Sequence, residues 1–286
     1  MTKQGIVLSL FGRSDVGTTR TNDEDSFVIS DLSDSVPIHA MSSTVALRVN
    51  ERGILVAVSD GMGGAHGGEV ASSLVVGALH EGMSTVKASN AEAALRESVE
   101  AANLRVVETA QASGHEGMGA TLTAVLFHGI YAYIAEIGDS RAYLLRSNRI
   151  VQLTRDQSYV QELIDSGSMT REQAEASDYK NVILQAMGLN PNISVPLNRI
   201  SIRRHDRFLV CSDGLSGKLG DQEMMAIVLQ SATLESACSA LIALAVDHGS
   251  EDDITVVLAQ VDGDGAPAMT EPERLSIETS KVFAPH

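Results

Sequence analysis

The chain has 286 residues, of which 44% are hydrophobic and 20% charged. It therefore has enough apolar side chains for a packed core. The 21 Lys and Arg residues against 37 Asp and Glu residues give a formal net charge of −16. This charge argues against nucleic acid and anionic membranes as partners. The two cysteines have no disulfide-scaffold or zinc spacing, and no apolar run approaches the roughly 18 residues of a membrane span. We expect a cytoplasmic monomer.

Short apolar runs and amphipathic segments alternate along the chain, and they predict strands and helices. The expected strands are Gln4–Phe11, Ser26–Ser30, Ile54–Val58, Leu122–His128, Ile130–Ile137, Arg141–Arg146, Phe208–Cys211 and Ile254–Val261. The expected helices are Glu69–His80, Ala91–Ala110, Thr170–Ala176 and Leu234–Val246. Ser89 or Asn90 is the expected cap of the second helix, and Thr170 with Gln173 has the capping-box spacing. The polar segment 31–53 is expected to be an extended hairpin or a mobile loop.

Neighbouring strands in the middle of the chain follow one another without a helix between them, which predicts antiparallel rather than parallel pairing. The fold class is therefore α+β. From Asp262 onward the chain has three prolines, scattered charges and no periodicity. We expect a single domain over residues 1–261 and a disordered tail over residues 262–286.

A pattern that occurs twice is the most informative feature of the sequence. Two apolar strands are each followed by Ser-Asp-Gly and then by small residues. The aspartate and glycine are Asp60-Gly61 in the first segment and Asp213-Gly214 in the second. Acids also stand at strand edges in Gly138-Asp139-Ser140, in Asp252-Asp253, and in the run Asp23-Glu24-Asp25. Each segment alone could be a solvated turn. Five such segments together indicate carboxylates that converge at one end of a sandwich.

Converging carboxylates need cations between them. An oxygen-only ligand set favours Mg²⁺ or Mn²⁺ over zinc. One bridging carboxylate can hold two ions about 4 Å apart, which suits in-line hydrolysis of a phosphate ester by a metal-bound water. Arg20, just upstream of the first acids, could bind the phosphate through two hydrogen bonds.

Six ordered motifs resemble those of the metal-dependent PPM (type 2C) serine/threonine phosphatases, in particular the bacterial stand-alone members. They are Arg20–Phe27, Ser59–Gly64, Gly119–Thr123, Ile137–Arg141, Cys211–Leu215 and Asp252–Val257. The resemblance covers roughly residues 5–261. It implies two antiparallel β-sheets packed as a sandwich and flanked by helices on both sides, a four-layer αββα architecture.

The resemblance also implies a role for each matching residue. Asp60 matches the carboxylate that bridges two ions, and the Gly61 carbonyl matches a ligand of the second ion. Asp213 and Asp252 match ligands of the first ion. The other assignments are Glu24 and Asp25 acting through metal-bound water, Asp139 with Asp213 at a third and weaker ion, and Arg20 at the phosphate.

The sequence departs from the family pattern at several positions. Asp252-Asp253 replaces the usual Asp-Asn, so either acid could be the ligand, and the alignment favours Asp252. Met62 stands where animal members have a histidine, as it does in bacterial relatives. His66 is a candidate substitute proton donor, although a solvated loop histidine is the simpler interpretation. In the stretch Arg155–Gly188, which resembles the mobile flap of the family, Gln157 replaces a usual histidine and the segment Ser177–Asn181 also differs.

The predicted function is hydrolysis of phosphoserine and phosphothreonine by a hydroxide bound at a two-metal Mn²⁺/Mg²⁺ centre. The substrates would be proteins phosphorylated by a serine/threonine kinase in bacterial signalling. Two alternatives stay open: a non-catalytic phosphopeptide-binding or regulatory module on the same fold, and a phosphatase for small-molecule monoesters.

Overall fold

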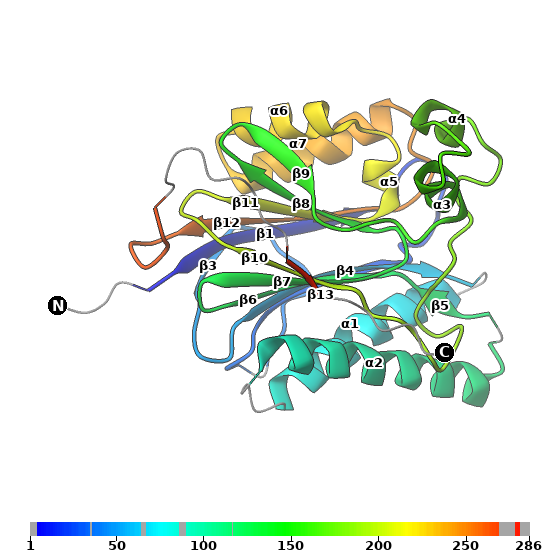
Figure 1. Ribbon diagram of the computed structural model, residues 1–286, viewed down its shortest axis with the longest axis horizontal. Helices are drawn as coiled ribbons and strands as arrows, with labels where there is room; N and C mark the ends of the chain where they lie inside the picture. The colour runs from blue at the N-terminus through cyan, green and yellow to red at the C-terminus, as the bar shows by residue number, and fades with distance from the viewer. Residues whose placement is uncertain are drawn as a thin grey trace.

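The computed structural model describes residues 5–34, 36–63, 67–85, 90–115, 117–268 and 278–280. Two antiparallel sheets pack face to face, and helices cover the outer face of each sheet (Figure 1). This arrangement confirms the predicted α+β fold with four αββα layers.

The first sheet has the strand order β3 (Val45–Arg48), β1 (Val7–Asp15), β12 (Ile254–Asp262), β11 (Arg207–Cys211), β8 (Arg141–Arg146) and β9 (Arg149–Gln152). The second sheet has the order β13 (Glu278–Ser280), β10 (Leu197–Ser201), β7 (Tyr131–Ile137), β6 (Leu122–His128), β4 (Ile54–Met62) and β2 (Asp25–Asp31), and β5 (Gly119–Ala120) pairs with the end of β4. Neighbouring strands pair antiparallel, including β1 with β12, β11 with β12 and β2 with β4.

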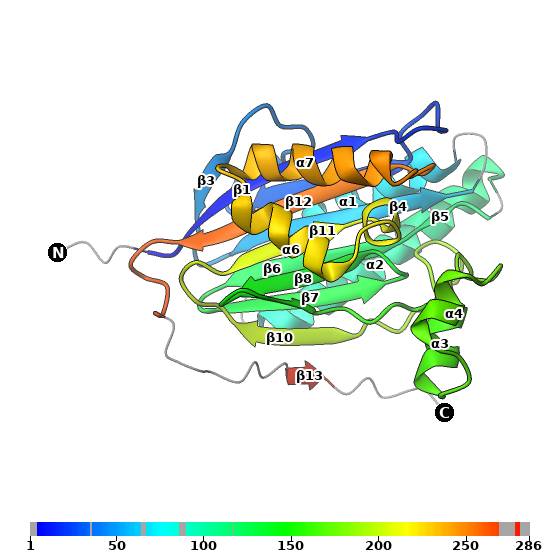
Figure 2. The ribbon, with the colours of Figure 1, turned by 90° about the horizontal axis from the view of Figure 1, so that it is seen from above.

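Helices α1 (Gly67–Thr85) and α2 (Ala91–Ser113) cover the second sheet, whereas α6 (Asp221–Gln230) and α7 (Leu234–Asp247) cover the first. The short helices α3 (Tyr159–Asp165), α4 (Arg171–Glu175) and α5 (Asp213–Ser216) lie at one end of the sandwich, together with β5 (right in Figure 1). Seen from above, α3 and α4 stand beyond the strand ends rather than over a sheet face (Figure 2).

Alternation along β4 shows how one apolar strand fills two core layers. Val56 and Val58 face the other sheet, while Leu55 and Ala57 face α1 and α2. All four are fully buried. A strand with two buried faces has to be apolar throughout, so the first polar side chain of β4 to escape the core comes at its end, where Asp60 stands.

The strands β6 and β8 have the predicted bounds, and Asn90 and Thr170 are the caps of α2 and α4, with the predicted capping box at Thr170. The sequence pattern does not predict β5, β9, β10, α3, α5 and α6. Segment 31–53 contains β3, which pairs with the edge of β1. Polar side chains fix the rest of this segment: Asn50 donates from Nδ2 to Asp31 and accepts from the Gly53 amide.

Part of the predicted tail lies within the described residues. The structure describes residues 262–268, where Ala266 is buried and the Arg204 amide donates to the Pro267 carbonyl. It also describes residues 278–280, which form β13 against β10. The other tail residues lie outside the described residues, so the boundary at residue 261 stays a prediction. Among the described helices, none combines the length and the apolar character that crossing a bilayer requires.

Candidate metal centre

The candidate acids lie at neighbouring strand ends. Asp25 opens β2 directly opposite Asp60 of β4. Asp139 lies in the short connection that crosses from β7 in one sheet to β8 in the other. Asp213 follows β11, and Asp252 precedes β12, the antiparallel partner of β11. Because antiparallel neighbours end and begin at the same edge, these five acids gather at one end of the sandwich, beside α5 and β5 (Figure 1).

A set of buried hydroxyls fixes the strand ends in the second sheet. Thr121 Oγ1 accepts from the Asp60 amide at 2.9 Å, and the Thr121 amide donates to the Asp60 carbonyl at 2.8 Å. The same hydroxyl contacts Ser140 Oγ at 2.7 Å, and Thr123 Oγ1 donates to the Ser140 carbonyl at 2.6 Å. The Asp60 backbone is thereby tied to the connection that carries Asp139. The sequence motif around Thr121 was recognised, but this role was not.

A second set fixes the ends of β11 and β12. The Thr255 amide donates to Ser212 Oγ at 2.9 Å, and the Ser212 amide donates to the Thr255 carbonyl at 3.1 Å. Asp253 is 3% exposed, and its Oδ2 accepts from the Glu24 amide at 2.8 Å. The Asp252 side chain is 41% exposed. Of the two acids that the sequence left open, Asp253 is therefore engaged in holding the backbone of Glu24, and Asp252 has the accessible carboxylate.

Arg20 lies against two of the candidate acids. Its Nη2 is 2.7 Å from Asp252 Oδ1, and its Nη1 is 3.4 Å from Glu24 Oε2. The Arg20 side chain is 43% exposed, so it can exchange these partners for a ligand that approaches from solvent. The guanidinium that forms these ion pairs is the same planar group that is predicted to bind phosphate.

Burial and mutual repulsion raise the pKa values of the gathered acids. Burial raises the pKa of Asp60 well above its ordinary value, and the charges of Asp25, Asp213, Asp139 and Asp252 raise it further. The pKa of Asp139 is raised to about 8, mainly by burial and then by the Asp213 charge. The pKa values of Asp25 and Asp213 are raised mainly by burial as well. Ionised carboxylates packed this closely are stable only with positive charge between them.

The residues present fit divalent ions. Both carboxylate oxygens of Asp25 and the Oδ1 atoms of Asp213 and Asp253 are buried and have no hydrogen-bond partner within the described part of the chain. Buried acceptors without partners are costly, and a cation would satisfy them. The available donors are carboxylate and carbonyl oxygens, which suit Mg²⁺ or Mn²⁺. Across the described ranges, no group of three or more His, Cys, Asp or Glu side chains is arranged so that it could already hold a metal ion.

Gly61 permits a close approach of three backbone segments. A Cβ at this position would lie 2.1 Å from the Gly68 carbonyl oxygen of α1 and 2.5 Å from the Glu24 carbonyl oxygen. The Gly61 amide donates to that Glu24 carbonyl at 3.1 Å. Glycine is required here because neither backbone neighbour can move aside without shifting a whole element.

We therefore expect Gly61→Ala to lower the free energy of unfolding by about 1–3 kcal/mol, the usual cost of overpacking. Gly77→Ala in α1 is the matched control: its added methyl group meets nothing within 4 Å, and alanine favours a helix over glycine. Denaturant titration of the two variants checks the prediction. Equal stability of both variants would show that the Gly61 contact is not tight.

The raised pKa values also predict how the stability of the metal-free protein depends on pH. The folded state holds protons that the unfolded chain releases, so stability falls as pH rises through the folded-state pKa values. Burial is the main cause of these values: about 8 for Asp139, about 8 for Glu136 and about 6 for Asp253. In EDTA we expect a higher Tm at pH 6 than at pH 8.5. With saturating Mn²⁺ the difference should shrink or reverse, because ions favour the ionised carboxylates. A Tm in EDTA that rises with pH would contradict this.

The predicted site residues Asp60, Gly61, Asp213, Asp252, Asp139, Glu24, Asp25 and Arg20 all lie at this end of the sandwich. Their metal roles stay predictions. His66 lies outside the described residues. Cys211, expected to be a core residue, is fully buried in β11, and burial raises its thiol pKa to about 12.

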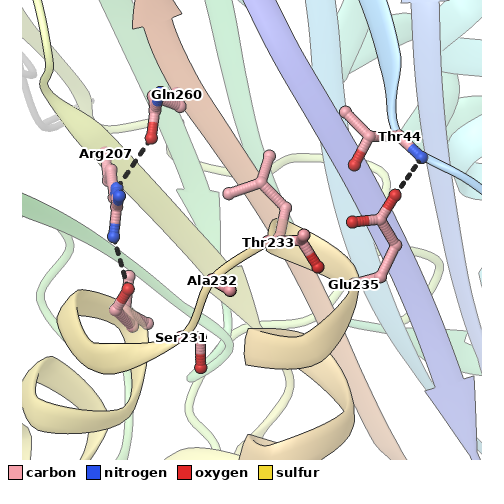
Figure 3. Close-up of a pocket in the computed structure, with 9 residues that line it drawn as sticks. Thr44, Arg207, Ser231, Ala232, Thr233, Glu235 and Gln260 are labelled. Atoms are coloured by element: carbon pink, nitrogen blue, oxygen red, sulfur yellow. Dashed lines mark hydrogen bonds between the residues drawn. The ribbon is translucent and has the colours of Figure 1, made fainter.

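A separate cavity of about 300 Å³ lies at the opposite end of the same strands (Figure 3). Arg207 opens β11 there, and its Nε donates to Gln260 Oε1 at 2.8 Å. The Thr44 amide donates to Glu235 Oε1 at 2.6 Å. Arg207 and Glu235 thus have hydrogen-bond partners within this cavity, whereas Thr44 Oγ1 is buried without one among the described residues.

This chain is similar to known protein phosphatases over most of its length. A sequence model of the protein phosphatase 2C family matches residues 43–266. The chain is 35% identical to the serine/threonine protein phosphatase PstP of Mycobacterium tuberculosis over 262 residues, which is 91% of this chain and 46% of PstP. The chain thus spans about half the length of that relative. It is 33% identical to the serine/threonine phosphatase stp of Listeria monocytogenes over 255 residues, covering 87% of this chain and 94% of stp.

Solved structures of serine/threonine phosphatases have the same fold. The serine/threonine phosphatase Stp1 from Staphylococcus aureus superimposes with a TM-score of 0.79 at 30% identity, over 92% of this chain and 98% of that one. The PstP catalytic domain in complex with two manganese ions gives a TM-score of 0.74 at 35% identity, over 90% of this chain and 99% of that one. On the family match, the shared fold and the gathered acids, this chain belongs to the protein phosphatase 2C family.

Proposed function

We propose that the protein hydrolyses phosphoserine and phosphothreonine in proteins with Mn²⁺ or Mg²⁺. The observation that carries the proposal is the convergence of partnerless, buried carboxylates at one strand end, with an exposed arginine beside them. The names of the relatives support a protein substrate: they are described as serine/threonine phosphatases.

Each residue has a proposed task at the site. Asp60 would be a ligand of both ions, Asp213 and Asp252 would be further ligands of the first, and the Gly61 carbonyl would be a ligand of the second. Glu24 and Asp25 act through water, and Asp139 with Asp213 would hold a third, weaker ion. When bound, the ions activate a water for in-line attack on phosphorus and neutralise the phosphate charge.

The protein groups do the remaining work. Arg20 leaves Asp252 and Glu24 and binds two phosphate oxygens, since its planar donor pair matches that geometry. The Thr121–Ser140 and Ser212–Thr255 hydrogen bonds keep the acids in place while the ions are exchanged. Asp253 holds the Glu24 backbone in register. These supports cost no reorganisation during the reaction.

We also propose a cytoplasmic monomer that opposes a serine/threonine kinase in bacterial signalling. In that compartment the two buried free thiols, Cys211 and Cys238, stay reduced.

The test is phosphate release from a phosphothreonine peptide with Mn²⁺, with and without excess EDTA, beside a nucleotide and a sugar phosphate. Release that requires metal and favours the peptide supports the proposal. Preference for the small esters would indicate a monoesterase. Absence of turnover by a folded, Mn²⁺-binding protein would indicate a regulatory module.

A further inference from the structure

The flap, defined here as residues 155–188, leaves the sandwich beside the Asp139 connection and carries α3 and α4 (Figures 1 and 2). Its first leg begins where the Arg155 amide donates to Glu136 Oε2 at 2.9 Å. Its last residues return to β5, where the Met187 amide donates to the Ala120 carbonyl at 2.8 Å. Both legs of the flap are thus close to the acidic centre.

Gln157 joins the first leg to the connection that carries Asp139. Its amide donates to the Gly138 carbonyl at 2.8 Å, and the Gly138 amide donates back to Gln157 Oε1 at 3.0 Å. Gln157 Nε2 donates to the Glu136 carbonyl at 3.3 Å. Gly138 cannot yield, because it has a φ of +96° and a Cβ there would lie 2.7 Å from Thr121 Cγ2.

The same side chain also holds the second leg. Gln185 Nε2 donates to Gln157 Oε1 at 3.0 Å. In addition, the Leu184 amide donates to the main-chain carbonyl of Gln157 at 2.7 Å. Gln185 is itself bonded to Ser194 at both its amide atoms. One carboxamide therefore connects both legs of the flap to the residue before Asp139.

The residues that Gln157 positions are apolar and exposed. Leu184 is 49% exposed, Tyr159 is 39% exposed, and Tyr159 contacts the 60% exposed Tyr179 ring edge to face at 5.8 Å. Apolar side chains exposed beside an acidic centre suit the polypeptide on either side of a phosphorylated residue, and not the phosphate itself.

We propose that Gln157 is a positioning residue that fixes the flap against the Asp139 connection, so that Tyr159 and Leu184 contact the substrate polypeptide. The inference rests on the proposed phosphatase function. On this proposal, the Gln157 side-chain amide holds the flap in place. The preference for a peptide over a small ester then depends on that amide.

The test compares Gln157→Ala with wild type on a phosphothreonine peptide and on p-nitrophenyl phosphate, both with saturating Mn²⁺. We expect the ratio of kcat/KM for the peptide to kcat/KM for the small ester to fall about tenfold, mostly through the peptide KM. The variant loses the three neutral hydrogen bonds of the Gln157 side chain, and a tenfold change corresponds to part of their combined net contribution. An equal fall for both esters, or an unchanged ratio, would overturn the proposal.

A second readout does not depend on activity. Trypsin cleavage after the exposed Lys180 in the flap, followed by mass spectrometry, should be about tenfold faster in Gln157→Ala. Gln185→Ala, on the other leg, should act in the same direction and be less than additive with it. Gln161→Ala is the control, because its side chain donates to Asp165 within the same helix, α3. If the wild-type protein hydrolyses neither ester, the proposed function is wrong. If the rate of trypsin cleavage is unchanged in Gln157→Ala and Gln185→Ala, the proposed role of Gln157 is wrong, whatever the activity.

Discussion

Asp60→Asn should abolish catalysis and yet stabilise the metal-free protein. The bridging carboxylate is the ligand shared by both proposed ions, and metal activation contributes several kcal/mol to such a reaction. We expect kcat/KM to fall at least about a thousandfold. In EDTA the Tm should rise, because a neutral amide replaces a buried acid that four other acids repel.

The measurements are phosphate release and thermal unfolding with EDTA and with Mn²⁺. The Mn²⁺-induced rise in Tm should be reduced in the variant, since ligand binding to the folded state is what produces it. Asp34→Asn is the control: Asp34 is an exposed acid in the connection between β2 and β3. Activity within tenfold of wild type, or a lower Tm in EDTA, would contradict the bridging assignment.

Arg20→Ala should weaken substrate binding without weakening metal binding. Loss of a charge-assisted contact to phosphate costs about 2 kcal/mol at a half-exposed site, so KM for a phosphopeptide should rise roughly 30-fold. Because Arg20 pairs with Asp252 at 2.7 Å, its removal frees that carboxylate. The Mn²⁺ affinity should therefore stay equal or increase.

The Arg20 prediction separates a phosphate-binding residue from a metal-site residue. Arg20→Lys keeps the charge but not the two-pronged donor, and should recover only part of the loss. Asp252→Asn is the contrasting variant, since it should weaken Mn²⁺ binding measured by titration calorimetry. A loss of Mn²⁺ affinity in Arg20→Ala as large as in Asp252→Asn would show that Arg20 supports the metal site instead.

Strongly patterned elements could be predicted from the sequence, and weakly patterned ones could not. The strands β6 and β8 are apolar runs with clear limits, and their bounds were predicted correctly. Helix α6 was missed because only Met224 and Val228 of it are fully buried, and its cap, Gly220, has no side chain to signal a start. Strand β9 is short, and none of its four residues is fully buried. Tertiary contacts, not local pattern, determine such elements.

The acids of the candidate centre could be found because each follows or precedes an apolar strand. Their supports could not. The Thr121–Ser140 contact joins residues of different strands, and only the register of the folded sheet brings them together. Asp252 is accessible and Asp253 is buried. Strand periodicity alone does not predict which of the two acids is accessible. The ion pair of Arg20 with Asp252 could not be predicted because only the fold brings these two distant residues together.

Anomalous X-ray diffraction from crystals soaked in Mn²⁺ tests the central claim most directly. We expect two strong manganese peaks that share Asp60, one of them also contacted by Asp213 and Asp252, with Arg20 turned away from Asp252. Peaks absent from this end of the sandwich, or bound only by other residues, would contradict the proposed two-metal centre.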